Sequence, residues 1–542
     1  MLIKTINVNK YINFNNKENY INYGFFIIFF IVCWKNLIDF GVTLDDEIYY
    51  TNADKTYQYV KSFFLSFTVD ELNIEKYRAD LKEWPIIFEL LIVFICDILN
   101  INKIDEIYYV SHQVNFIIFS LSLLCFQKII FKRFNNLKFS FISLLFFIIS
   151  PRIITESFYN TRDIFFMSLF IFYIYFLYGF IENKSYSNII KLSLFSALLI
   201  NTKILGIIPI GIFCIIYLYN FLNTKKKFLK EINLILLFLL FTLLTIYVSW
   251  PYLWSNPAVN LYIAFRNILE VHENLIVVNF YFGEYIQSNL TPWHYRIVWF
   301  LISTPLIILI LFFLGFIYIS YKLIQILKNT LNQEYTIQNK NIIDLFLLLI
   351  FIASFFIVIE FNKSKFGGWR HLYFLYPIVI YFSIHAIDYF YKKNIKRIYK
   401  IFLTLLIILN SSYNLLWIYN NHPHQYIYFN LINKKYYMNN FDLDWWGISH
   451  KAAIDYILAN DDSEKIKISS KGFTSLRNTF LFLSEKNKSR VIISDINNAI
   501  YIIDNKIKRL RNYEDVNKKL FFKFYVIKVN EQAISDIYKR RN

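Results

Sequence analysis

The sequence is poor in the residues that form the best-known soluble enzyme motifs. It has only 11 Gly, 9 Pro and 4 Cys among 542 residues. The patterns GxGxxG, GxSxG and HExxH and the P-loop are missing, which argues against a glycine loop that cradles phosphate and against metalloprotease chemistry. The cysteines lie in apolar runs without CxxC or metal-ligand spacing, so they indicate buried apolar side chains. Any phosphate chemistry must use side-chain cations and amides.

Long apolar runs are what the sequence has in abundance. Hydrophobic residues make up 56% of the chain, and the mean hydropathy is +0.39. Runs of about 17 to 22 apolar residues recur, the length needed to cross a bilayer, so the chain is predicted to be a multi-pass membrane protein. The net charge of +18 falls mainly in short loops between these runs. That distribution favours membrane orientation over a nucleic-acid partner.

The apolar runs predict about eleven membrane spans. They lie near residues 23–41, 109–130, 138–150, 164–181, 189–204, 205–222, 232–250, 297–320, 342–361, 372–390 and 398–418. The segment 84–99 is shorter and carries Glu89 and Asp97, so we expect a helix in the membrane interface. If it crossed, every basic loop would move to the side opposite the Lys-bearing N-terminus. The N-terminus is therefore predicted to lie inside.

This topology predicts an all-α membrane domain over residues 1–419, with a first external loop of about 42–108. After about residue 420, charges are evenly scattered and short alternating runs occur at 465–469, 490–494, 499–504 and 523–529. These runs predict a small α/β domain over residues 420–542, outside the membrane. The polar segments between spans collect on the same external side, which indicates an outward-facing site.

The stretch GVTLDDEIYY places Asp45, Asp46 and Glu47 directly after the first apolar run. A solvated acidic loop is the plain structural alternative. We expect these acids to lie at the C-terminal end of a helix, where they oppose the helix macrodipole. Carboxylates at a membrane surface can act as general bases, because partial desolvation raises their affinity for a proton.

Two further external segments carry charged residues at the ends of spans. SFYNTRDIFF places Asn160, Arg162 and Asp163 at the mouth of the fourth span, where they form either a helix cap or an anion contact in which Asp163 orients Arg162. NTKILG places Lys203 in a tight turn between two spans. This lysine either snorkels to the interface or binds a phosphate as a point charge.

The stretch KSKFGGWRHLYFLYP places Arg370 and His371 just before another span. Basic residues there can serve as interfacial anchors. The adjacent Gly367 and Gly368 instead suggest a tight backbone that carries the cations into a site.

In their order, these motifs resemble those of the GT-C membrane glycosyltransferases, in the branch of the protein O-mannosyltransferases and the lipid A aminoarabinose transferase. The acidic pair of the first external loop is matched by Asp46 and Glu47. Bacterial members carry FxNPKDIPF, matched by FYNTRDIFF with Thr161 and Phe165 in place of the prolines. They also carry a glycine-flanked RH, matched by GGWRH, and HPYQYxYFN followed by DYWG, matched by HPHQYIYFN at 422–430 and LDWWGIS at 443–449. The departures here are His424 and Trp445, each in place of tyrosine.

The resemblance implies transfer of a sugar from a polyprenyl-phosphate donor to an external lipid, glycan or protein acceptor. It implies Asp46 as the general base and Glu47 as its neighbour. The donor phosphate would be held by Arg162, Lys203, Arg370 and His371, supported by Asn160 and Asp163. Some GT-C enzymes use a divalent cation, but the branch resembled here generally does not, so we expect neither metal nor cofactor. The protein is expected in the plasma (inner) membrane with its site outside; a transporter or flippase of lipid-linked glycans is the alternative.

Overall fold

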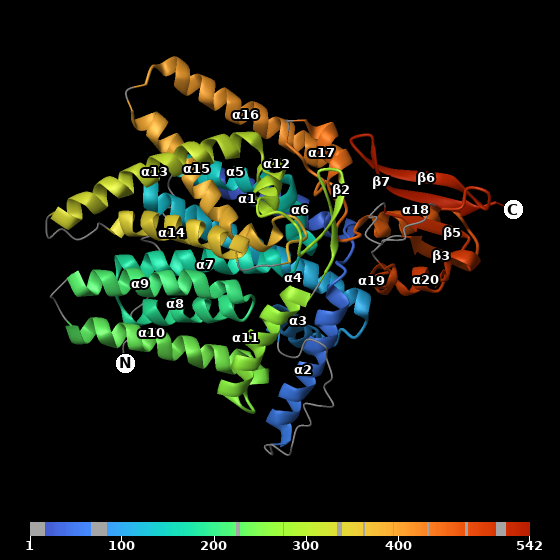
Figure 1. Cartoon of the computed structure of the whole chain (residues 1–542), viewed down its shortest axis with the longest axis horizontal. Coiled ribbons are helices and arrows are strands. Elements are labelled where there is room, and N and C mark those ends of the chain that lie inside the picture. The colour runs from blue at the N-terminus through green and yellow to red at the C-terminus, as the bar shows by residue number, and fades with distance from the viewer. Residues whose placement is uncertain are drawn as a thin grey trace.

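The computed structural model describes residues 17–66, 84–223, 228–274, 276–332, 339–360, 364–393, 395–430, 433–471, 475–505 and 516–541. Within these residues the chain forms a bundle of long helices and, at one end of it, a smaller domain built on a five-stranded sheet (Figure 1). The predicted fold class, an all-α membrane domain with a small C-terminal α/β domain, is confirmed.

Seven helices of the described chain are long and apolar enough to cross a membrane. They are α4 (Ile104–Phe134), α7 (Asp163–Glu182), α10 (Phe228–Ser249), α13 (Leu306–Asn332), α14 (Asn339–Glu360), η6 with α15 (Arg370–Leu375 and Tyr376–Lys392) and α16 (Arg397–Asn420). The chain is thus an integral multi-pass membrane protein. Shorter helices complete the bundle: α1 (Lys17–Lys35), η2 (Leu37–Asp39), α5 (Leu137–Ile148), α6 (Pro151–Tyr159), α8 (Tyr186–Ile200), η4 (Ile204–Gly206), α9 (Ile207–Asn223) and α12 (Tyr295–Ser303). The number eleven stays a prediction.

Proline interrupts the helices at two places, one directly after the predicted span 138–150 and one inside the predicted span 297–320. α5 and α6 meet at an angle of 70°, and Pro151 occupies the first turn of α6. The predicted span 297–320 is divided between α12 and α13, and Pro305 lies in the break. Proline lacks the N–H that continues a helix and disfavours helical backbone in the residue before it. The first break places the end of α6 beside the start of α7, where the site forms.

Outside the site, close packing and one buried ionic cluster hold the helices of the bundle together. α13 approaches α15 so closely that a Cβ at Gly315 would overlap the backbone carbonyl of Phe382. Asp344, fully buried on α14, accepts hydrogen bonds from the Arg133 guanidinium at 2.9 and 2.6 Å and from the Tyr381 hydroxyl at 2.6 Å. A buried carboxylate with this many partners holds α4, α14 and α15 in one arrangement.

The connections between spans carry α2 (Asp46–Ser66), α3 (Ile87–Ile98), η5 (Pro251–Leu253), α11 (Pro257–Asn274) and the hairpin of β1 (Val278–Tyr281) and β2 (Glu284–Gln287). α3 has 12 residues, about 18 Å at the helical rise. That is too short to cross a bilayer core of about 30 Å. It buries Phe88, Glu89 and Ile92 and exposes Phe94 and Ile98, so its length and two-sided surface agree with the predicted interfacial helix.

The acids of GVTLDDEIYY lie at a helix start, and the prediction that they oppose a macrodipole at a helix end was wrong. α1 ends at Lys35, whereas Asp46 and Glu47 form the first turn of α2. Carboxylates in this position are favoured by the helix macrodipole. The sequence did not reveal that a new helix starts at Asp46. An extended segment between η2 and α2 separates the acids from the apolar run that precedes them.

The C-terminal domain has the sheet order β4-β3-β5-β7-β6. β3, β4 and β5 are parallel, and β7 is antiparallel to both β5 and β6. Its elements are α17 (Lys434–Asn440), α18 (Ser449–Asn460), β3 (Ile466–Lys471), α19 (Arg477–Leu481), α20 (Glu485–Lys488), β4 (Val491–Ile493), η7 (Ile496–Asn498), β5 (Tyr501–Asp504), β6 (Phe521–Val529) and β7 (Gln532–Arg540). The four predicted strands are present, and β7 was not foreseen. The domain boundary at residue 420 stays a prediction.

Candidate active site

Asp163 is the centre of a charged cluster at the end of the bundle nearest the C-terminal domain. It is the first residue of α7 and is buried, with 2% of its side chain exposed. The Lys203 ammonium, from the turn between α8 and η4, forms an ion pair with one of its oxygens. The Arg370 Nη1, from the start of η6, lies 3.7 Å from the other. Since two cations share one carboxylate, these three residues carry a net positive charge suited to an anion.

Asn160 orders this cluster from the α6–α7 turn. Its amide donates to Asp163 Oδ2 at 2.9 Å and to Glu156 Oε2 at 2.7 Å, while its own oxygen accepts the backbone N–H of Asp163 at 2.9 Å. The other oxygen of Glu156 accepts the Tyr373 hydroxyl at 2.6 Å. Asn160 thus positions the Asp163 carboxylate, and its supporting role at a donor phosphate stays a prediction. Glu156 was missed by the sequence reasoning, although its spacing of four from Asn160 on a helix was a usable signal.

Of the three acids at the start of α2, Asp45 faces the cation cluster. Its carboxylate lies 3.9 Å from Arg370 Nη1 and is 43% exposed. The surrounding protein nonetheless raises the pKa of Asp45 by desolvation, against the opposing pull of Arg370. Asp45 is therefore a reachable carboxylate with raised proton affinity, beside the cations.

Asp46 and Glu47 point elsewhere. Asp46 is only 4% exposed, and its Oδ2 accepts the backbone N–H of Thr43 at 2.7 Å. Burial raises the pKa of Asp46 to about 7. Glu47 accepts a hydrogen bond from the Arg477 guanidinium of α19, at 2.7 Å. Asp46 and Glu47 therefore hold the loop that precedes α2 in place. The proposed role of Asp46 as the general base stays a prediction.

Arg162 belongs to a neighbouring group that ties α3 to the cluster. Its guanidinium stacks on the Tyr49 ring at 4.0 Å, lies 3.4 Å from Glu89 on α3 and donates to the carbonyl oxygens of Pro85 and Thr202. Desolvation raises the pKa of Tyr49 to about 12, so the ring stays neutral. The ion pairs of Asp163 go to Lys203 and Arg370, so the expectation that Asp163 orients Arg162 is not met. Arg162 and Thr202 thus pack directly against the start of α3, at Pro85 and Glu89.

The paired glycines bring Arg370 into the cluster, as expected. Gly367 and Gly368 have φ of +67° and +69°, a conformation that side chains disfavour. A Cβ on Gly367 would lie 2.7 Å from the Arg370 side chain, and one on Gly368 would press against the Trp299 ring. His371 packs edge-on against Phe366, with ring centroids 5.6 Å apart. Its predicted phosphate contact stays a prediction.

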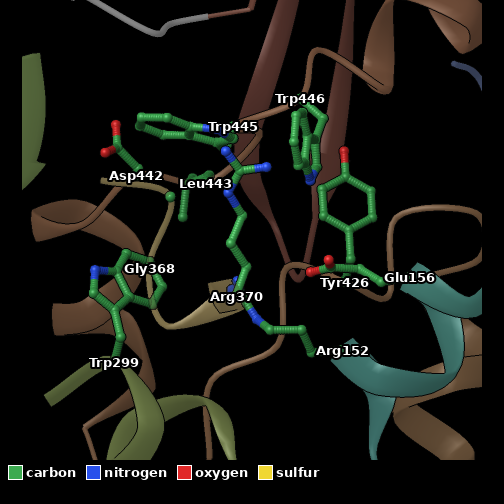
Figure 2. A pocket seen from close by; sticks show the side chains of 11 residues that line it. Arg152, Glu156, Trp299, Gly368, Arg370, Tyr426, Asp442, Leu443, Trp445 and Trp446 are labelled. Atoms are coloured by element: carbon green, nitrogen blue, oxygen red, sulfur yellow. The ribbon is translucent and has the colours of Figure 1, made fainter. Parts of the chain in front are cut away.

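A small cavity, with room for about one water molecule, lies directly beside Arg370. Figure 2 shows the arginine side chain rising toward Trp445 and Trp446, with Glu156 and Arg152 of α6 on the opposite side. The Arg370 guanidinium lies over the Trp446 ring at 4.2 Å. Arg152 and the two tryptophans were not proposed from the sequence as site residues, because their segments are far apart in the chain.

No family model and no curated protein matches the sequence. Among solved structures, the chain is similar to ArnT from Cupriavidus metallidurans bound to undecaprenyl phosphate, at 12% identity over 96% of this chain and 98% of that chain, with a TM-score of 0.47. It is similar to apo ArnT at 13% identity, over 95% and 97% of the two chains, with a TM-score of 0.48.

A second group of similar structures is the oligosaccharyltransferase AglB from Archaeoglobus fulgidus. The form in complex with an inhibitory peptide and a dolichol-phosphate matches at 10% identity, over 78% of this chain and 61% of that chain, with a TM-score of 0.42. ArnT, the lipid A aminoarabinose transferase, and AglB are GT-C glycosyltransferases. Likenesses this weak assign no activity to this chain.

The site is rich in ion pairs between carboxylates and cations. Within the described ranges, no group of three or more His, Cys, Asp or Glu residues is arranged to hold a metal ion. The carboxylates of the cluster are instead paired with Lys203, Arg370 and Arg162. The absence of a metal requirement stays a prediction.

Proposed function

We propose that this protein is a glycosyltransferase that moves a sugar from a polyprenyl phosphate to an external lipid, glycan or protein acceptor. The observation that carries the proposal is the pairing of an accessible carboxylate, Asp45, with the Asp163–Lys203–Arg370 cluster, at 3.9 Å from Arg370 Nη1. Such a site holds an anion and a proton acceptor side by side, at the end of a membrane bundle.

The donor phosphate would lie against Lys203 and Arg370. Both are largely shielded, with 15% and 11% of their side chains exposed, so their charges are poorly screened by water. As the bond between the sugar C1 and the phosphate oxygen breaks, one more negative charge develops on the phosphate. Prepositioned cations stabilise that charge without reorganising. Because the phosphate leaves as a stable anion, no acid is needed to protonate it, in contrast to glycosidases.

The acceptor needs one base. Its oxygen or nitrogen attacks C1 while its proton passes to a carboxylate, so the products are the glycosylated acceptor, a protonated acid and polyprenyl phosphate. The geometry favours Asp45 for this step because it is reachable, and access is the first requirement of a general base. Asp46 is the candidate from the motif, and substitution of each residue separates the two assignments.

By the positive-inside tendency, the basic loops favour an external site, and we expect the protein in the plasma (inner) membrane. The prenyl chain would reach the cluster from the lipid along the start of α3, where Pro85, Ile87 and Phe88 lie beside Arg162.

The test is transfer by purified protein in undecaprenyl-phosphate-sugar proteoliposomes, together with mass spectrometry of envelope glycolipids and glycoproteins from cells with and without the gene. We expect one sugar to be missing from one class of glycoconjugate without the protein. Movement of the lipid-linked sugar across the bilayer, with no new glycosidic bond, would establish the transporter alternative and overturn the proposal.

A further inference from the structure

A second charged cluster lies at the end of the bundle opposite the C-terminal domain, where α13 ends and α14 begins (Figure 1). Its centre is the fully buried carboxylate of Asp344. Arg133 of α4 binds both oxygens of this carboxylate, and 11% of the arginine side chain is exposed. The Lys322 ammonium of α13 lies 3.6 Å from the same carboxylate and is 31% exposed. Two cations therefore share one carboxylate.

The excess positive charge of this cluster has no second acid to balance it. Among the described residues, Asp344 is the only carboxylate that forms an ion pair with Arg133 or Lys322. The Lys322 ammonium also donates to the side-chain oxygen of Asn341 at 3.1 Å, but this acceptor is neutral. A partly shielded charge without a counter-charge is unfavourable, so the cluster is suited to bind one anion.

Only Arg133 and Lys322 of this cluster reach the surface. His385 Nε2 lies 3.2 Å from Asp344, and 2% of the histidine side chain is exposed. The Tyr381 hydroxyl that bonds to Asp344 is also enclosed by protein. Arg133 binds Asp344 through Nε and Nη2, so Nη1 is the guanidinium nitrogen that remains for a ligand.

The cluster lies near the depth at which lipid phosphates are found. Asp344 is the sixth residue of the 22-residue helix α14, about 8 Å from the start of a helix about 33 Å long. Such a length spans the hydrocarbon core of a bilayer, about 30 Å. Long basic side chains near a helix end extend towards the headgroups.

The surface beside Lys322 is apolar and faces outward. Ile317, Tyr321 and Ile324 lie on one face of α13, with 64%, 63% and 53% of each residue exposed. Their spacing of four and three residues forms a continuous stripe along the helix. Acyl chains would cover this stripe, which brings a lipid headgroup to the level of Lys322.

We propose that Arg133 and Lys322 bind the phosphate of an anionic phospholipid at this end of the bundle. A phosphodiester carries one negative charge, which equals the excess left by two cations and one carboxylate, and it accepts charge-assisted hydrogen bonds from both cations. A zwitterionic headgroup brings no net charge. The predicted topology puts this end in the cytoplasmic leaflet, whose anionic lipids are attracted to basic clusters between spans. The site is separate from the Asp163 cluster, and the inference does not depend on the proposed transfer reaction.

The experiment measures lipid binding to the full-length protein in a non-ionic detergent. Phosphatidylglycerol and phosphatidylcholine with the same acyl chains are compared by native mass spectrometry and by thermal melts, with inorganic phosphate as a third probe. The variants are Lys322→Gln, Lys322→Arg and the control Lys328→Gln. Lys328 is an exposed lysine of the same helix, so its substitution changes the net charge equally. Thermal melts without lipid show whether each variant is folded.

Wild-type protein is expected to retain phosphatidylglycerol in preference to phosphatidylcholine and to gain thermal stability from it. Lys322→Gln should weaken phosphatidylglycerol binding about tenfold, the effect of losing one charge-assisted hydrogen bond. Lys322→Arg should keep most of the binding, and Lys328→Gln should bind like wild type.

Equal retention of the two lipids by wild-type protein would overturn the proposal. Equal losses in Lys322→Gln and Lys328→Gln would also overturn it, because they would indicate general surface charge. Stabilisation by inorganic phosphate as large as that by phosphatidylglycerol would assign the cluster to a free anion instead of a lipid. These measurements use no sugar donor, so failure of the proposed glycosyl transfer leaves the lipid site standing, and the reverse also holds.

Discussion

The side-chain amide of Asn478 donates a hydrogen bond to the backbone carbonyl oxygen of Thr43, at 2.8 Å. The same amide reaches the carbonyl of Leu44 at 2.9 Å. Asn478 lies on α19 of the C-terminal domain, whereas Thr43 and Leu44 directly precede the acids of α2. The C-terminal domain therefore holds the loop that presents Asp45 to the cations.

Asn478→Ala should lower kcat for transfer more than it raises the KM for the donor. The substitution removes two hydrogen bonds, each worth about 1 kcal/mol, and loosens the acid loop without touching Lys203 or Arg370. Steady-state kinetics measure the effect. The control is Arg477→Ala, which breaks the neighbouring exposed pair with Glu47 and should matter less. Equal effects of the two substitutions would contradict this role for Asn478.

Asp45→Asn should reduce transfer by a factor of about 100 to 10,000, the usual contribution of a general base. Asp46→Asn should retain more activity, since an asparagine oxygen can still accept the Thr43 N–H. Initial rates with saturating donor report the difference. The reverse order would assign the base to Asp46, as the motif implies.

Asp46 should also make stability depend on pH. Its pKa is about 7 in the folded protein and 3.8 as an unperturbed carboxyl, so between these values the folded state holds more protons. Stability therefore falls as pH rises from about 4 to 7. Asp46→Asn should raise the Tm at pH 8 relative to wild type and have little effect at pH 4. A Tm difference between the proteins that is constant across this range would contradict the raised pKa.

Lys203→Met should lower kcat about 100- to 1,000-fold, comparable to loss of a donor that stabilises transition-state charge. The flexible methionine keeps much of the lysine stem's apolar volume and removes the charge paired with Asp163. Because that leaves buried Asp163 with one cation fewer, the double variant Lys203→Met with Asp163→Asn should recover thermal stability but no activity. Transfer assays and thermal melts of both variants test this.

Asp344→Asn should destabilise the protein by about 3 to 5 kcal/mol, because it leaves the buried Arg133 without its ionised partner. Asp344 pairs with Arg133, His385 and Lys322, outside the Asp163 cluster. The protein that remains folded should therefore transfer sugar at the wild-type rate. A large fall in kcat per folded molecule would show that this cluster couples to the site.

The sequence by itself determined the membrane class, most of the helices and four strands of the C-terminal sheet, because apolar length and alternation are local signals. It also identified Asp163, Lys203 and Arg370 as charged residues at the ends of spans. Proline explains the two helix breaks, yet only the tertiary structure showed where the broken ends meet.

The tertiary structure alone decided which charges touch. Asp163 pairs with Lys203 and Arg370 rather than with adjacent Arg162, and Asp45 faces the cations while Asp46 and Glu47 turn away. The directions of these three acidic side chains depend on where α2 starts and on Asn478, which is more than 400 residues further along the chain. Contacts between residues so far apart produce no local pattern in the sequence. A membrane span does produce one, because its apolar residues form a continuous run.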